Sequence, residues 1–175
     1  MAIEYETKIL NIEKKDIENK LISFGAKKLF EHKFRRWVLD MGNHEWTRLR
    51  DEGDKVTLTY KKRNNKEIDG VEEIETIVED FDEIAEILLK QKWVGTYYQE
   101  NKRIMYVMDN IEFCIDNWPD IPTYLEIEGK SMEDVKKGLK MLDLEKHDVG
   151  NISVCDVYEK YDINLHDRDV LKFNK

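Results

Sequence analysis

Charged side chains alternate with uncharged ones along the segments of this chain that are typical of β-strands. In the first such segment, residues 3–10, the charged residues are Glu4, Glu6 and Lys8. Because successive side chains of a strand point to opposite faces, these three share one face. The pattern predicts seven further strands, at residues 34–40, 45–50, 55–63, 71–79, 101–108, 111–117 and 123–129. The fold must therefore either solvate or enclose one charged face of a sheet.

Helical spacing marks four other segments. They lie at about residues 13–24, at residues 80–91, from Ser131 onward and at about residues 153–161. Asp80, Ser131 and Ser153 are expected as N-cap residues. A length of 175 residues suits a single core. We therefore predict an α+β fold, with one domain at residues 1–161 and a loosely held C-terminal tail at residues 162–175.

The charged faces allow two interpretations. A single charged strand face is ordinarily solvated, as in an antiparallel sheet with one face in water. For the whole set this interpretation weakens, because glutamate is depleted in strands and E-x-E pairs place like charges side by side. The opposite faces are apolar and would receive the Leu- and Ile-rich helices. We therefore predict a closed antiparallel β-barrel with a charged interior and helices packed outside.

A barrel lined with both signs of charge favours a particular kind of ligand. Clustered carboxylates are hard oxygen ligands that suit Mg²⁺ or Mn²⁺. Arginine and lysine hold phosphate groups through charge-assisted and partly bidentate hydrogen bonds. The interior is thus suited to a divalent metal together with a polyphosphate.

The order of the charged motifs resembles that of the triphosphate tunnel metalloenzymes, also called the CYTH superfamily. The motifs are Glu4-Tyr5-Glu6-Thr7-Lys8, Arg48 with Arg50, Lys61 in TLTYK, Glu73 with Glu75, Arg103 in KRIMY, Asp116, and Glu126 with Glu128 in YLEIEG. The family includes class IV adenylyl cyclases, thiamine triphosphatases and inorganic tripolyphosphatases. The sequence looks more like the cyclase-like branch than like the short triphosphatases.

The resemblance implies roles for these residues. It implies metal ligands at Glu4, Glu6, Asp116, Glu126 and Glu128, and a triphosphate clamp formed by Lys8, Arg48, Arg50, Lys61 and Arg103. Glu73 and Glu75 would hold basic residues in place or bind a second metal, and Glu4, Glu6 and Lys8 would be the catalytic residues. Two positions differ from the family pattern, where Arg36 stands four residues before Asp40 and Asn101 two residues before Arg103.

The resemblance implies a triphosphate phosphohydrolase that uses Mg²⁺ or Mn²⁺ and acts on tripolyphosphate or a nucleoside triphosphate. An alternative is a class IV adenylyl cyclase, in which the ribose 3′-hydroxyl replaces water as the nucleophile and gives cyclic AMP and pyrophosphate. A second alternative is a non-catalytic binder of polyphosphate or a nucleotide. The sequence does not decide among them, because one set of residues serves all three.

Composition excludes other classes of partner. A net charge of −9 argues against nucleic acids and anionic membranes, which are themselves polyanions. No run of about 18 apolar residues and no apolar leader is present. Cys114 and Cys155 are far apart and lack metal-ligand spacing, as expected of thiols in a reducing compartment. We expect a cytoplasmic protein with a small-molecule partner, either a monomer or a homodimer.

Overall fold

The computed structural model describes residues 2–65 and 67–174. Residues 1, 66 and 175 lie outside the described residues, and with them the first residue of the predicted domain and the last residue of the predicted tail. The strands are β1 (Ala2–Ile9), β2 (Lys27–Gly42), β3 (Glu45–Asp51), β4 (Val56–Arg63), β5 (Val71–Val78), β6 (Gly95–Met108), β7 (Ile111–Asn117), β8 (Tyr124–Gly129) and β9 (Val170–Leu171). The helices are α1 (Lys14–Ser23), α2 (Phe81–Leu89), α3 (Met132–Leu142) and α4 (Val154–Glu159), with short 3₁₀ helices η1 (Glu145–His147) and η2 (Leu165–Asp167).

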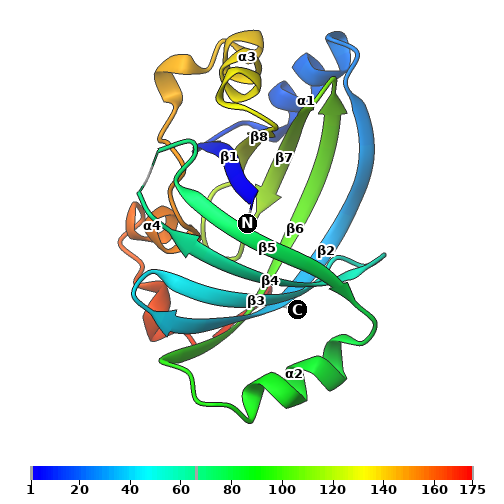
Figure 1. The fold of residues 1–175 in the computed structure, drawn as a ribbon. Helices are drawn as coiled ribbons and strands as arrows, with labels where there is room; N and C mark the ends of the chain where they lie inside the picture. The colour runs from blue at the N-terminus through cyan, green and yellow to red at the C-terminus, as the bar shows by residue number, and fades with distance from the viewer. Residues whose placement is uncertain (1, 66, 175) are drawn as a thin grey trace.

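Strands β1 to β8 form a closed antiparallel barrel (Figure 1). Their order around the barrel is β2-β3-β4-β5-β1-β8-β7-β6, and pairing between β6 and β2 closes the ring. Three strands separate β1 from β2 in either direction, so these two strands form opposite walls. β9 pairs in parallel with β6 beyond the ring. The predicted closed barrel is confirmed.

The strand registers place charged residues from neighbouring strands together. Glu6 lies opposite Glu128 and Lys8 opposite Glu126 across the β1–β8 pair. In a closed barrel alternate residues point inward, so each of these pairs enters the interior as a unit. The period-two pattern of the sequence thus becomes an inner lining of charges.

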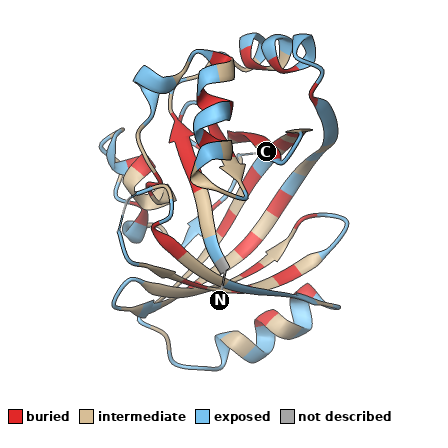
Figure 2. Ribbon diagram, turned by 45° about the horizontal axis from the view of Figure 1, so that its top comes forward, coloured by how far each residue is buried: buried red, intermediate tan, exposed pale blue. Residues whose placement is uncertain are grey.

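Apolar residues on the outward faces of the strands pack against the helices. One core lies between α1, α3 and the outer faces of β6, β7 and β8, with Leu21 and Leu139 among its buried members. A smaller core joins α2 to β3 through Phe81, Ala85 and Leu49. Figure 2 shows buried residues recurring along the strands, while the outer faces of the helices are exposed. Helices packed outside the barrel are therefore confirmed.

The predicted N-caps of three helices are present. Asp80, Ser131 and Ser153 each accept a hydrogen bond from the backbone N–H three residues further on. At α4 the Asp156 side chain also accepts from the backbone N–H of Ser153, which completes a capping box. These local bonds fix where α2, α3 and α4 begin.

Two strands begin earlier than the sequence pattern predicts. β2 begins at Lys27 and β6 at Gly95, rather than at residues 34 and 101. The two strands pair along this extra length, from Lys27 opposite Val107 to Asp40 opposite Gly95. The predicted starts are wrong because pairing extends these strands where the outer residues of β2 lack a clear apolar alternation.

The residues after 161 contact the body of the protein. Leu165 and Leu171 are buried in a core with Trp118 and Tyr158. The segment after residue 161 is attached to the body of the protein through these two leucines. The division of the chain at residue 161 remains a prediction. Among the described residues, no helix is long and apolar enough to cross a membrane.

Candidate active site

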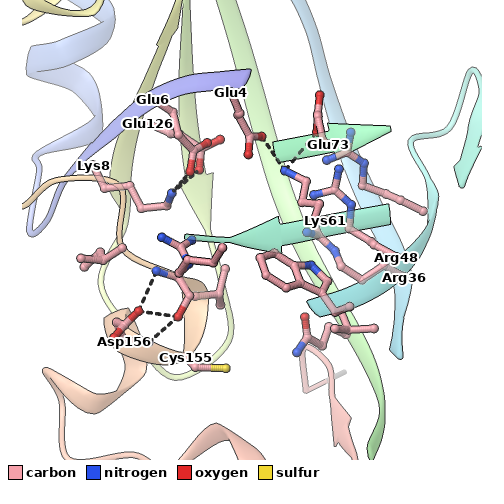
Figure 3. Close-up of a pocket in the computed structure, with 18 of the residues that line it drawn as sticks. Glu4, Glu6, Lys8, Arg36, Arg48, Lys61, Glu73, Glu126, Cys155 and Asp156 are labelled. Atoms are coloured by element: carbon pink, nitrogen blue, oxygen red, sulfur yellow. Dashed lines mark hydrogen bonds and ion pairs between the residues drawn. The ribbon is translucent and has the colours of Figure 1, made fainter. Parts of the chain in front are cut away.

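The barrel encloses a cavity of about 990 Å³. The predicted site residues that line it are Glu4, Glu6, Lys8, Arg48, Arg50, Lys61, Glu73, Glu75, Arg103, Glu126 and Glu128. Asp116, the remaining predicted residue, is fully buried and does not line it. These lining residues come from six strands, and their charged side chains meet in one space, part of which Figure 3 shows.

Three carboxylates on β1 and β8 form a cluster. One oxygen each from Glu4, Glu6 and Glu128 lies within 4.8 Å of the others. Burial and the neighbouring carboxylates outweigh Lys8 and raise the pKa of Glu6 to about 7. Burial, Glu4 and Glu6 raise the pKa of Glu128 to about 8. Close carboxyl oxygens of this kind suit a hard divalent cation, whose charge would favour their ionised form.

Lysine side chains hold the two ends of the β1 motif. Lys8 Nζ lies 2.7 Å from Glu6 Oε1 and 3.2 Å from Glu126 Oε2. Lys61 Nζ lies 2.5 Å from Glu4 Oε1 and 3.3 Å from Glu73 Oε2. Although burial favours the neutral form of Glu4, Lys61 and Arg48 lower its pKa. The carboxylates of one motif thus occupy two different electrostatic environments.

Asp116 and Glu126 are bound to a guanidinium and lie outside the three-carboxylate cluster. Arg103 Nη2 lies 2.6 Å from Asp116 Oδ2 and 2.8 Å from Glu126 Oε1. Asn101 Nδ2 donates a 2.7 Å hydrogen bond to Asp116 Oδ1. Asp116 is thereby placed behind Arg103, where its observed contacts are to hydrogen-bond donors. Its assignment as a metal ligand remains a prediction.

The carboxylates of β5 contact basic residues on β3 and β4. Glu73 pairs with Lys61, and Glu75 Oε2 lies 3.7 Å from Arg48 Nη2. Thr59 Oγ1 donates a 2.8 Å hydrogen bond to the same oxygen of Glu75. Of the two roles left open for these glutamates, the geometry favours holding basic side chains in place.

Arginines gather on the wall away from β1. Arg48 and Arg50 come from β3, and Arg50 Nη2 lies 2.5 Å from Glu52 Oε1. Burial and the nearby Arg48 lower the pKa of Arg50 to about 10. The Nε atoms of Arg48 and Arg50 have no hydrogen-bond partner among the described residues. Both arginines line the cavity, so this wall is cationic.

Several lining residues were not singled out by the sequence as site residues. Glu52 continues the inward alternation of Arg48 and Arg50, so the two-residue period of the strand could have predicted that it faces the interior. Arg36 also points inward, and only its departure from the family pattern drew attention to it. Cys155 and His166, which line the cavity near its α4 side, carried no local signal because their placement depends on how the C-terminal segment folds back.

Fold and site together define a closed-barrel protein with a tunnel lined by opposed carboxylates and guanidinium groups. Residues 2–150 match the family model of the CYTH domain. The chain therefore belongs to the CYTH domain family.

Several solved structures have a similar fold. The PH1012 protein from Pyrococcus horikoshii OT3 is 24% identical, with a TM-score of 0.70 over 83% of this chain and 94% of that one. A candidate adenylate cyclase from Vibrio parahaemolyticus is 13% identical, with a TM-score of 0.73 over 90% and 98% of the two chains. HpAC1 from Hippeastrum, a candidate adenylyl cyclase reported to have a dominant triphosphatase activity, is 16% identical, with a TM-score of 0.62 over 91% and 96%. No curated protein matches the sequence.

Proposed function

We propose that this protein is a metal-dependent triphosphate phosphohydrolase that binds its substrate inside the barrel. One observation carries the proposal: the three-carboxylate cluster and the arginine wall line the same enclosed cavity. A triphosphate needs cationic groups along its length, and its hydrolysis needs charge neutralisation more than a covalent nucleophile. The interior supplies both kinds of group within one space.

The carboxylate cluster fits Mg²⁺ or Mn²⁺. Glu4, Glu6 and Glu128 would hold the ion through oxygen atoms, which both metals prefer. A bound ion of this kind neutralises phosphate charge and lowers the pKa of coordinated water. Lys8 and Lys61 hold two of the three carboxylates in place in the absence of the ion.

The basic residues would bind and orient the phosphate chain. Arg48 and Arg50 line the cavity and have Nε donors with no partner among the described residues, and Arg103 is held in position by Asp116 and Glu126. Fixed donors of this kind lose little entropy on binding and stabilise charge as it develops on the transferred phosphoryl group. The barrel walls around the cavity limit contact with bulk water, and this strengthens these interactions.

A class IV-type adenylyl cyclase is the second candidate, and the size of the cavity favours it. A volume of about 990 Å³ reaches the upper part of the range typical of sites for organic ligands, and exceeds what a bare phosphate chain requires. The similar structure from Vibrio parahaemolyticus is also that of a candidate adenylate cyclase. In this reaction the ribose 3′-hydroxyl attacks the α-phosphorus and pyrophosphate leaves.

Product analysis tests the proposal. The protein is incubated with tripolyphosphate or ATP, with Mg²⁺ or Mn²⁺, and the products are separated. Orthophosphate release supports hydrolysis; cyclic AMP with pyrophosphate supports cyclisation; metal-dependent binding without turnover supports a non-catalytic binder. Glu6→Gln should suppress turnover in a way that extra metal partly restores, whereas Glu133→Gln on the exposed side of α3 should not. Absence of both binding and turnover would refute all three functions.

A further inference from the structure

Arg36 is an inward-facing arginine on β2, the strand opposite β1. It is 5% exposed and lines the cavity. Its cross-strand neighbours are Arg50 on β3 and Gln99 on β6. Because three strands separate β1 from β2 on each side, Arg36 stands on the wall that faces the three-carboxylate cluster (Figure 3).

In the described part of the chain, the guanidinium of Arg36 forms no ion pair with a carboxylate. Among the described residues, no carboxylate oxygen lies within 4.0 Å of a guanidinium nitrogen of Arg36. By contrast, ion pairs with at least one carboxylate are formed by Lys8, Lys61, Arg50 and Arg103. The contacts of Arg36 are a hydrogen bond from Nη2 to the amide oxygen of Asn101 and the face of Trp118, 4.7 Å from its centroid. A neutral amide and an indole ring are thus its direct contacts, and Asp116, which binds the same Asn101, acts on the positive charge only from beyond ion-pair distance.

Other arginines surround this charge rather than neutralise it. Burial, followed by the charges of Arg50, Arg48 and Arg103, lowers the pKa of Arg36 well below its ordinary value. A buried charge without a partner costs several kcal/mol, because water no longer solvates it. An anion bound at this wall would remove that cost, and the local concentration of positive charge attracts one.

Free hydrogen-bond donors accompany the unpaired charge. The Nε atoms of Arg36, Arg48 and Arg50 are buried and have no partner in the part of the chain that the structure describes. They come from two adjacent strands, β2 and β3, and from side chains that line the same cavity. Guanidinium groups arranged in this way match the several oxygen atoms of one phosphoryl group.

We propose that Arg36 is a substrate-binding residue that forms, with Arg48 and Arg50, a subsite for the phosphoryl group farthest from the carboxylate cluster. This inference rests on the proposed triphosphate function, and it places one end of the bound phosphate chain at these three arginines. The phosphate chain then spans the tunnel from the carboxylates on β1 and β8 to the arginines on β2 and β3. A chain with a free, doubly charged terminal phosphoryl group is the ligand class that this subsite favours.

A matched pair of variants tests the inference. Arg36→Met removes the inward charge, and Arg35→Met removes the charge next to it, which points outward and pairs with Asp51 and Asp82. Isothermal titration calorimetry with tripolyphosphate, with and without Mg²⁺, should show binding weakened by about tenfold or more in Arg36→Met, as for other hydrogen bonds to charged groups. Arg35→Met should bind within about twofold of the wild type, because both variants change the net charge equally.

Thermal unfolding distinguishes substrate binding from a structural role. Without ligand, Arg36→Met should have a Tm equal to or above that of the wild type, because an unpaired buried charge is gone. With tripolyphosphate, its rise in Tm should be smaller than that of the wild type. A lower ligand-free Tm together with unchanged affinity would instead identify Arg36 as structural and overturn the inference.

Two further results separate the inference from the proposed function. Arg36→Lys keeps the charge and loses the planar set of donors, so it should show an intermediate loss of affinity even if Arg36→Met folds poorly. Wild-type affinity in Arg36→Lys and in Arg36→Met would refute the subsite while leaving the triphosphate function intact. Failure of the wild type to bind tripolyphosphate would refute the triphosphate function and the subsite together.

Discussion

Raising the pH should destabilise the metal-free protein, chiefly through Glu128. Burial and the charges of Glu4 and Glu6 raise the pKa of this carboxyl from 4.5 to about 8. A group with a higher pKa in the folded state binds its proton more tightly there. The stabilisation is complete below the unfolded pKa and is lost as the pH rises through the folded value. The free energy of unfolding should therefore fall toward alkaline pH.

The size of the effect follows from the two pKa values. Between about pH 6 and pH 9 the carboxyl is ionised in the unfolded chain, but in the folded protein it stays protonated over about two pH units of that interval. At about 1.4 kcal/mol per pKa unit, the loss from Glu128 alone is about 2 to 3 kcal/mol. Glu6, with a pKa raised to about 7 by burial, acts in the same direction.

Urea denaturation measures this loss. The wild type, Glu128→Gln and the exposed control Glu133→Gln are unfolded at intervals across the pH range in the presence of a chelator. Glu128→Gln should lack most of the decline, and the control should follow the wild type. Replacing the chelator with Mg²⁺ should reduce the decline, because the ion favours the ionised carboxylates. A wild-type stability that is constant or rises with pH would refute the reasoning, as would a Glu128→Gln profile parallel to it.

Three further changes have defined outcomes. Arg103→Ala should lower the free energy of unfolding by about 3 to 5 kcal/mol, because Asp116 stays buried without its cation; in urea denaturation, adding Asp116→Asn should restore part of the loss. Gly138→Ala should lower the free energy of unfolding by about 1 to 3 kcal/mol, since the new Cβ would lie 2.8 Å from Ile127 Cγ2. A higher free energy of unfolding, as helix propensity alone predicts, would contradict this packing. Arg50→Ala should weaken tripolyphosphate binding by about tenfold or more and orthophosphate binding less; calorimetry showing equal, small losses would contradict its placement.

The inner face of the barrel was predictable because strand geometry has a fixed period. Once residues 3–10 are a strand, Glu4, Glu6 and Lys8 must share a side, and apolar residues must occupy the other. Helices that need an apolar surface then decide which side faces outward. Closure followed from these two local facts without knowledge of any long-range contact.

Partner choice within the cavity was not predictable from spacing. Asp116 and Glu128 carry the same chemical group and the same inward parity, yet Asp116 binds Arg103 while Glu128 joins the carboxylate cluster. Which cation a carboxylate meets depends on register between strands and on side-chain reach, and neither is encoded locally. The same limit applies to Leu165 and Leu171, whose burial depends on contacts with Trp118 and Tyr158.

A crystal structure of the protein with Mn²⁺ and tripolyphosphate tests the central claim most directly. Anomalous scattering locates the manganese independently of the phosphate. The account predicts a peak between Glu4, Glu6 and Glu128, with a phosphate chain that runs from it toward Arg48 and Arg50. Manganese and phosphate found together outside the barrel, with the cavity holding only water at saturating concentrations of both, would contradict it.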